Sequence, residues 1–371
     1  MRDVRVDKLA NMLVNYSVSA KPGDNVLVEV TDCPTVMTTA LIREIYAAGA
    51  VPFVWNNQSA VSHALAKGYT PGQLDLKAEV DAQLMKQMQC YIGITAAGND
   101  FQMSDIGIEK LSMRMQHYNN KVHRQIRVPL VRWCGLRFPT SSMAQNARMS
   151  TEAFEDFFFD VCTMDYSRLK RAALPLADLM ARTDRVHIKG PGTDLRFSIK
   201  GMPSIPCAGE SNVPDGEVFS APVRDSVNGI VTYNTPSMQN GMLFENVSLT
   251  FEKGRIVKAT SSNTEELNKI LDTDEGARYI GEFSIGINPY LTDPIRNTLF
   301  DEKITGSFHF TPGNCYDVCY NGNKSAIHWD LISIQRPEYG GGEIWFDDVL
   351  VRKDGRFVLP ELNALNPENL K

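Results

Sequence analysis

The first half of the chain alternates between two hydrophobic periods. Short apolar runs with strand composition occur at residues 25–31, 51–55, 90–95 and 126–132. Apolar positions at helical spacing occur at residues 4–16, 32–48, 72–87, 103–118, 151–161 and 166–182. Strands that alternate with helices form βαβ units, and such units imply a parallel sheet covered by helices. Residues 1–182 therefore predict an α/β N-terminal domain with a mainly parallel sheet.

From about residue 186 the strands become shorter, and Gly, Pro and Asn turns recur every ten residues or so. Strand-like runs occur at 186–189, 195–199, 217–219, 229–233, 247–251, 326–334, 343–346 and 349–351, with one helix at 263–270. Gly190 and Gly192 stand between two strands. A phosphate-binding loop needs a helix start at that point, so this class of site is excluded. Residues 183–371 predict a β-rich α+β domain.

Composition narrows the class of protein. The chain has 371 residues, 43% of them hydrophobic, which is ample for two buried cores. The net charge is −6 and no basic block occurs, so we expect no nucleic-acid partner. The charged start lacks the apolar region of a signal peptide, and no run approaches the roughly 18 apolar residues of a membrane helix. Seven irregularly spaced cysteines favour reduced thiols and a cytoplasmic location.

Two of the six histidines fall in one 30-residue stretch that also holds a suitably placed aspartate. His328 and Asp330 are two residues apart in a strand-like run, so their side chains should project from one face. An imidazole beside a carboxylate on a rigid strand is half of a metal site, and His309, in a second strand-like run, could supply a third ligand. The alternative is a buried histidine that is simply bonded to its neighbouring aspartate.

Three glutamates could complete such a site. Glu217 follows a Pro-Asp-Gly turn, and Glu282 lies in an apolar run after a glycine. A buried carboxylate needs a partner, because burying a lone charge is costly. That partner could be an arginine, with Arg224 and Arg278 as candidates, or a metal ion. Glu302, seven residues before His309, is a further candidate ligand.

These motifs resemble the M29 family of metal-dependent aminopeptidases. The matching segments are, in order, PDGEVFSAP, GARYIGEFSIG, LFDEKITGSFHFTPG and SAIHWDLI. The N-terminal half matches more loosely, through KPGDNVLVEV and MAQNARMSTEAFEDFFF. Where the family tends to have H-I-A-L-G, this chain has His309-Phe-Thr-Pro-Gly313. The histidine is kept, so we expect an altered pocket wall and a retained ligand.

The resemblance implies a homodimeric enzyme that hydrolyses the N-terminal peptide bond of peptides with a free N-terminus. It also implies a dinuclear site for divalent ions (Zn, Co or Mn) that activates a bridging water. Tyr316 falls at the family's active-site tyrosine, and Glu282 would be both the bridging ligand and a catalytic group. The metal-ligand positions that the resemblance implies are Glu217, Glu282, Glu302, His309, His328 and Asp330.

Two other functions are compatible with the sequence. One is a mononuclear Fe(II) ring-cleaving dioxygenase on the same scaffold, because a related 2,5-dihydroxypyridine dioxygenase keeps an H-x-D pair. The other is a non-catalytic binding protein, against which the complete set of acidic positions speaks. Tyr316 could also be a core residue whose hydroxyl bonds to the backbone.

Overall fold

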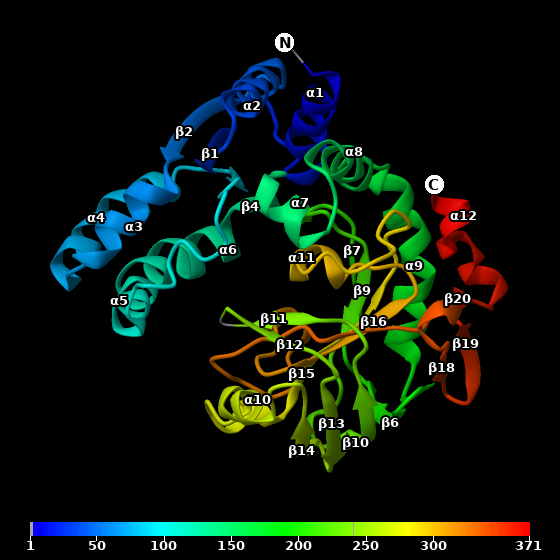
Figure 1. Cartoon of the computed structure of the whole chain (residues 1–371). Coiled ribbons are helices and arrows are strands. Elements are labelled where there is room, and N and C mark those ends of the chain that lie inside the picture. Colours follow the sequence, from blue (N-terminus) through cyan, green and yellow to red (C-terminus); the bar gives the residue numbers. More distant parts are fainter. Residues whose placement is uncertain (1–2, 240) are drawn as a thin grey trace. The chain divides into compact units, whose positions relative to one another are not determined.

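The computed structural model describes residues 3–239 and 241–371 (Figure 1). The chain forms two compact units. Unit 1 holds residues 3–163 together with Gly209–Val213, and unit 2 holds Met164–Ala208 and Pro214–Lys371. The expected division into domains at residues 1–182 and 183–371 stays a prediction. No helix in the described residues is long and apolar enough to cross a membrane.

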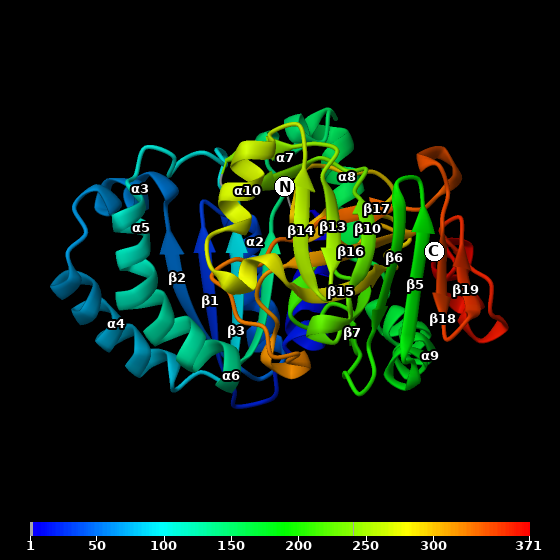
Figure 2. The ribbon, with the colours of Figure 1, turned by 90° about the horizontal axis from the view of Figure 1, so that it is seen from below.

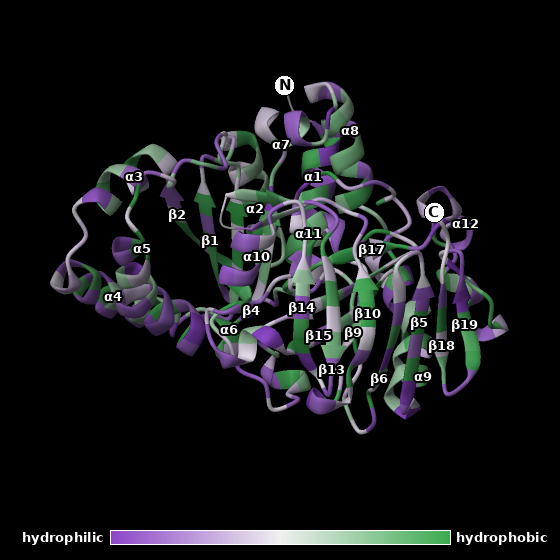
Figure 3. Cartoon of the chain, turned by 60° about the horizontal axis from the view of Figure 1, so that its bottom comes forward, coloured by the Kyte–Doolittle hydropathy of each residue, from purple (hydrophilic) through white to green (hydrophobic). Residues whose placement is uncertain are grey.

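Unit 1 is built on a five-stranded parallel sheet, as the sequence predicts. Its strands lie in the order β2 (Val51–Asn57), β1 (Asn25–Thr31), β3 (Cys90–Thr95), β4 (Arg132–Arg137) and β8 (Asn212–Val213). Strand β1 is buried along most of its length and is mainly green in the hydropathy view (Figure 3). The principal helices of unit 1 are α1 (Val4–Asn11), α2 (Thr35–Ala47), α3 (Ser59–Lys67), α4 (Pro71–Met85), α5 (Ile108–Arg114), α7 (Ser141–Asn146) and α8 (Thr151–Cys162).

The predicted strand at residues 126–132 is wrong. A π-helical segment, η2 (Met115–Arg127), continues α5 and is followed by a single turn, α6 (Val128–Leu130). Tyr118, Val122 and Ile126 recur every fourth residue and form the buried side of this segment. The apolar side chain of Ile126 thus belongs to a helical period, and strand β4 begins only at Arg132.

Unit 2 consists mainly of antiparallel sheets, which confirms the β-rich class. The large sheet has eight strands, which Figure 2 shows mostly side by side. Its order is β14 (Arg255–Thr260), β13 (Ser248–Glu252), β10 (Asn228–Thr232), β6 (Thr193–Ser198), β5 (Arg185–Gly190), β18 (Glu343–Phe346), β19 (Val349–Lys353) and β20 (Arg356–Phe357). The longer helices of unit 2 are α9 (Tyr166–Arg182) and α10 (Thr264–Leu271). A short hairpin joins β11 (Ser237–Gln239) to β12 (Met242–Phe244).

A second, five-stranded antiparallel sheet carries the candidate site. Its order is β17 (Ile332–Ile334), β16 (Ser307–Pro312), β15 (Ile280–Gly286), β9 (Glu217–Ser220) and β7 (Ile205–Cys207). One face is apolar. There Phe283 and Phe310 pack against Phe197 of the large sheet, each with a ring-centroid distance of 5.0 Å. All residues of β15 and β16 are buried, so polar side chains on the opposite face are also shielded from water.

The predicted strand at 326–334 is shorter than expected. Only Ile332–Ile334 forms β17, and the segment before it touches the sheet irregularly, through a single bridge between Gly313 and His328. The carboxylate of Asp274 accepts a hydrogen bond from the backbone N–H of Ala326, which replaces a strand partner. Trp329 and Leu331 still point into the core. His328 and Asp330 therefore share the opposite side, as the alternation predicts.

Candidate metal centre

The register of the five-stranded sheet gathers polar side chains on one face. Ser284 lies opposite His309, Glu282 lies opposite Thr311, and Glu217 lies opposite Gly286. Directly opposed residues share a face, as do residues two apart on one strand. Three strands thus present Glu217, Glu282 and His309 to a common buried space, beside the hydroxyls of Ser284 and Thr311.

His309 lies between two carboxylates. Its Nε2 is 3.1 Å from Oε1 of Glu282 and 3.3 Å from Oε2 of Glu217. Its Nδ1 lies 3.2 Å from the backbone oxygen of Glu302, and because that oxygen can only accept, Nδ1 is the donor. Burial alone would lower the pKa of His309, but the hydrogen bond to Glu282 and the charge of Glu217 raise it to about 9.

His328 repeats the arrangement on the other side of Glu282. Its Nδ1 donates to the backbone oxygen of Asn314 over 2.8 Å, and its Nε2 is 3.3 Å from Oδ1 of Asp330 and 3.5 Å from Oε2 of Glu282. Against the effect of burial, Asp330 raises the pKa of His328 to about 10. The pKa of Asp330 is lowered, because the charge and hydrogen bond of His328 outweigh its burial. Oδ1 of Asp330 also accepts a hydrogen bond from Thr311.

Five of the six predicted ligands therefore converge in two overlapping groups. Potential ligand atoms lie within 4.8 Å of one another in Glu217, Glu282 and His309, and likewise in Glu282, His328 and Asp330. Glu282 belongs to both groups, and burial raises the pKa of its carboxyl. This set of residues fits divalent ions for two reasons. Each imidazole donates from Nδ1 to a backbone carbonyl, which leaves Nε2 directed at the carboxylates and available to a metal ion. Closely spaced buried carboxylates also need a cation.

Glu302, the sixth predicted ligand, faces a lysine. Its Oε1 is 2.7 Å from Nζ of Lys303, and burial raises the pKa of its carboxyl to about 8. The same Nζ lies 2.5 Å from Oε1 of Glu217 and 3.8 Å from Oδ1 of Asp215. Burial lowers the pKa of Lys303, but the three carboxylates outweigh it and raise that pKa well above the usual value.

Several residues of the candidate site were not predicted from the sequence. Lys303, Asp215 and Ser284 each lie one or two residues from a predicted ligand, and that proximity was the available signal. Ser284 is two residues after Glu282 on one strand, and its hydroxyl donates to Oε2 of Glu217 over 2.9 Å. Cys207 lies close enough to Asp215 and Glu217 to form a third potential group, but burial raises the pKa of its thiol well above the ordinary value.

Tyr316 lies next to His328, one of the candidate ligands. It precedes the short helix η5 (Asp317–Cys319), and its residue is 48% exposed. Its ring contacts the imidazole of His328 and the ring of Phe219. Partial burial, together with the negative charges of Glu282 and Asp330, raises the pKa of its hydroxyl. The hydroxyl is therefore protonated at neutral pH and can donate a hydrogen bond.

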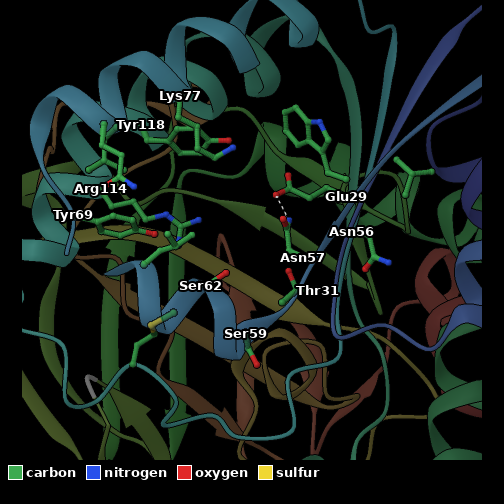
Figure 4. Close-up of a pocket in the computed structure, with 16 residues that line it drawn as sticks. Glu29, Thr31, Asn56, Asn57, Ser59, Ser62, Tyr69, Lys77, Arg114 and Tyr118 are labelled. Atoms are coloured by element: carbon green, nitrogen blue, oxygen red, sulfur yellow. Dashed lines mark hydrogen bonds between the residues drawn. The ribbon is translucent and has the colours of Figure 1, made fainter. Parts of the chain in front are cut away.

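Unit 1 contains a separate cavity of about 500 Å³ at the carboxyl ends of β1 and β2 (Figure 4). Glu29 lies in its wall, where it accepts hydrogen bonds from Asn57 (3.2 Å) and Tyr91 (2.9 Å), and burial raises the pKa of its carboxyl. Lys77 and Arg114 add positive charge. None of the predicted site residues lines this cavity.

Comparison with known proteins connects most of the chain to one family. Residues 2–357 match the sequence profile of the thermophilic metalloprotease family (M29). Aminopeptidase AmpS of Bacillus subtilis (strain 168) is 34% identical over 164 residues, which cover 40% of this chain and 39% of that relative.

Two solved structures share the fold over almost the whole chain. Wild-type AmpT from Thermus thermophilus superposes with a TM-score of 0.81 at 21% identity, covering 96% of this chain and 99% of that one. The 2,5-dihydroxypyridine dioxygenase from Pseudomonas putida KT2440 superposes with a TM-score of 0.62 at 13% identity, covering 96% and 98%. At these identities both likenesses concern the fold alone.

Proposed function

The chain belongs to the thermophilic metalloprotease family M29, and we propose that it is a metal-dependent aminopeptidase that hydrolyses the N-terminal peptide bond of peptides. The observation that carries the proposal is the pair of ligand groups that share Glu282. The relative AmpS is named as an aminopeptidase, which supports the same activity.

The proposed centre would hold two divalent ions, one for each ligand group. Its carboxylate and imidazole donors suit Zn, Co or Mn. Glu217, Glu282 and His309 would hold one ion, and Glu282, His328 and Asp330 would hold the other, so that Glu282 would serve both. Glu302 would be a further ligand. Such ions supply Lewis acidity, which lowers the pKa of water and polarises a carbonyl group.

The residues of the chain have complementary roles in this proposal. Glu282 would help to take the proton that leaves the attacking water, because its carboxylate lies within reach of both ligand groups. The protonated hydroxyl of Tyr316 donates a hydrogen bond to the oxyanion that forms on the peptide carbonyl. A preorganised donor of this kind contributes about 2.7–4 kcal/mol to the transition state.

A second candidate function is that of a dioxygenase. It is supported by the likeness in fold and by the presence of two histidines and an aspartate in the two ligand groups. A mononuclear iron oxygenase uses two histidines and one carboxylate, with open positions for oxygen and substrate. Here Glu217 and Glu282 add two carboxylates within reach of His309. These extra acidic ligands favour two ions and hydrolysis.

Chelation tests the proposal directly. The purified protein should release N-terminal residues from short peptides, lose this activity after exhaustive chelation, and regain it with Zn, Co or Mn. Oxygen uptake with a dihydroxypyridine serves as the counter-assay. One tightly held iron per chain, with oxygen uptake and no peptide hydrolysis, would decide for the dioxygenase.

We also propose that the enzyme is a homodimer and works in the cytoplasm. The first part rests on the resemblance to the family, and the second on the irregular spacing of the seven cysteines, none of which forms a disulfide bond in the described residues. Light scattering at micromolar concentration measures the assembly, and a monomeric mass would contradict it.

A further inference from the structure

Lys303 is a cation built into one side of the candidate centre. It follows the short helix α11 (Thr298–Asp301) and Glu302, and only 2% of its side chain is exposed. Its backbone oxygen accepts a hydrogen bond from Asn288, which fixes the start of the side chain. An ammonium has three donors, and here three carboxylates lie within 4.0 Å of it, those of Asp215, Glu217 and Glu302.

The two oxygens of the Glu217 carboxylate face different neighbours. Its Oε1 contacts Lys303, while its Oε2 accepts from Ser284 and faces His309. Glu217 is therefore both a candidate ligand and the counter-ion of a buried lysine. A divalent ion beside Glu217 and His309 has to share this carboxylate with a positive charge, and like charges repel strongly in a shielded interior.

Among the described residues, no lysine or arginine forms an ion pair with the ligands on the other side of the centre. In the described part of the chain, the ion pairs of Glu282 and Asp330 are formed with His309 and His328. Nε2 of His328 already faces the carboxylates of Glu282 and Asp330, so these three groups could hold an ion without sharing a carboxylate with a lysine.

We propose that Lys303 makes the two halves of the centre unequal. The half formed by Glu282, His328 and Asp330 binds its divalent ion first and tightly. The half formed by Glu217, Glu282 and His309 binds a second ion more weakly, because that ion must compete with the Lys303 ammonium for Glu217. This inference rests on the proposed metal centre, and it assigns Lys303 a positioning role outside the catalytic groups.

Manganese titration of the metal-free whole chain tests the order of binding. Calorimetry should resolve two steps, with the second dissociation constant at least about tenfold larger than the first. Electron paramagnetic resonance should show isolated Mn(II) at one equivalent and an exchange-coupled pair only at higher concentration. Two equal steps, or a coupled pair already at one equivalent, would overturn the inference.

Two substitutions identify the lysine as the cause. Lys303→Met keeps a long apolar stem and removes the charge, so the second ion should bind at least about tenfold more tightly while the first changes little. Lys303→Arg keeps the charge and should retain two unequal steps. An unchanged or weaker second step in a folded Lys303→Met protein, with circular dichroism as the check, would contradict the assignment.

Ligand substitutions keep the test decisive if Lys303→Met fails to fold. With Lys303 in place, Glu217→Gln should retain one tightly bound Mn(II), whereas Asp330→Asn should lose the tight step. The reverse pattern would sink the inference. Failure of the wild type to bind any divalent ion would instead refute the proposed function itself, so the two failures are distinguishable.

Discussion

The ring of Tyr316 packs on the imidazole of His328, with centroids 4.8 Å apart and planes inclined by 51°. This contact holds the phenol beside a candidate metal ligand although about half of the residue is exposed. Tyr316→Phe keeps the ring contact and removes only the hydroxyl. We expect kcat for peptide hydrolysis to fall by about 10²–10³-fold, with a smaller effect on KM and with metal content unchanged.

Tyr320→Phe is the matched control, because Tyr320 is similarly exposed (46%) and lies four residues further along the same segment. It should behave as the wild type. If Tyr316→Phe retains the wild-type kcat, the tyrosine is a structural residue.

Ser284 orients Glu217 through its hydroxyl. Loss of a group that orients a ligand typically lowers metal affinity by about 10–100-fold, and we expect a loss of this size in Ser284→Ala, measured by competition with a chromogenic chelator. Ser220→Ala removes a hydroxyl that is equally buried but bonds to the backbone oxygen of Pro203, so it should leave metal affinity unchanged. Equal affinities in both variants would show that the Ser284 bond is dispensable.

Glu282 is shared by both ligand groups, so its charge should matter more than that of any other ligand. Glu282→Gln preserves the shape of the side chain, and we expect it to fold, to lose one or both ions, and to lose peptide hydrolysis. Elemental analysis of the purified protein gives the ion content per chain. Glu265→Gln, on the exposed side of α10, controls for loss of a negative charge elsewhere. Full metal content with normal turnover in Glu282→Gln would contradict the assignment of Glu282 as a metal ligand.

His123 should make stability depend on pH. Burial and the nearby charge of Arg127 lower its pKa to about 4, whereas an unfolded histidine has a pKa of about 6.5. The unfolded chain therefore takes up the proton first, so the stabilising contribution is complete above pH 6.5. It falls as the pH drops towards 4, by at most about 3 kcal/mol.

His123→Gln should reduce this dependence. Urea unfolding at pH 7.5, above the window, and at pH 5, within it, measures the free energy of unfolding at each pH. The difference between the two values should be smaller in the variant. Parallel pH profiles for the two proteins would show that another group causes the acid sensitivity.

Local patterns predicted much of the fold. Most of the candidate ligand set came from the resemblance to a family, and its role in metal binding stays a prediction. The βαβ alternation indicated the parallel sheet of unit 1, and the two-residue spacing placed His328 and Asp330 on one side. The strand predicted at residues 126–132 was wrong, because a short apolar run such as the one around Ile126 has the same composition in a strand and on the buried side of a helix. The irregular conformation of the segment before β17 was not predicted, because its partners, such as Asp274, are far away in the sequence.

The position of Lys303 beside the candidate ligands was not predicted for a similar reason. A lysine after Glu302 resembles any solvated charge, and only the pairing of three strands brings Glu217 to its ammonium. Long-range register decides which neighbours a side chain has, and no local spacing rule contains that information.

The candidate ligands begin at residue 217 and end at residue 330, on segments that adjoin only when β9, β15 and β16 are paired. An unfolded chain cannot bring them together, so each bound ion favours the folded state by mass action. In a cell short of divalent metal, unit 2 would spend more time open to proteases. The supply of metal would then set how long each copy of the protein lasts, in addition to how fast it works.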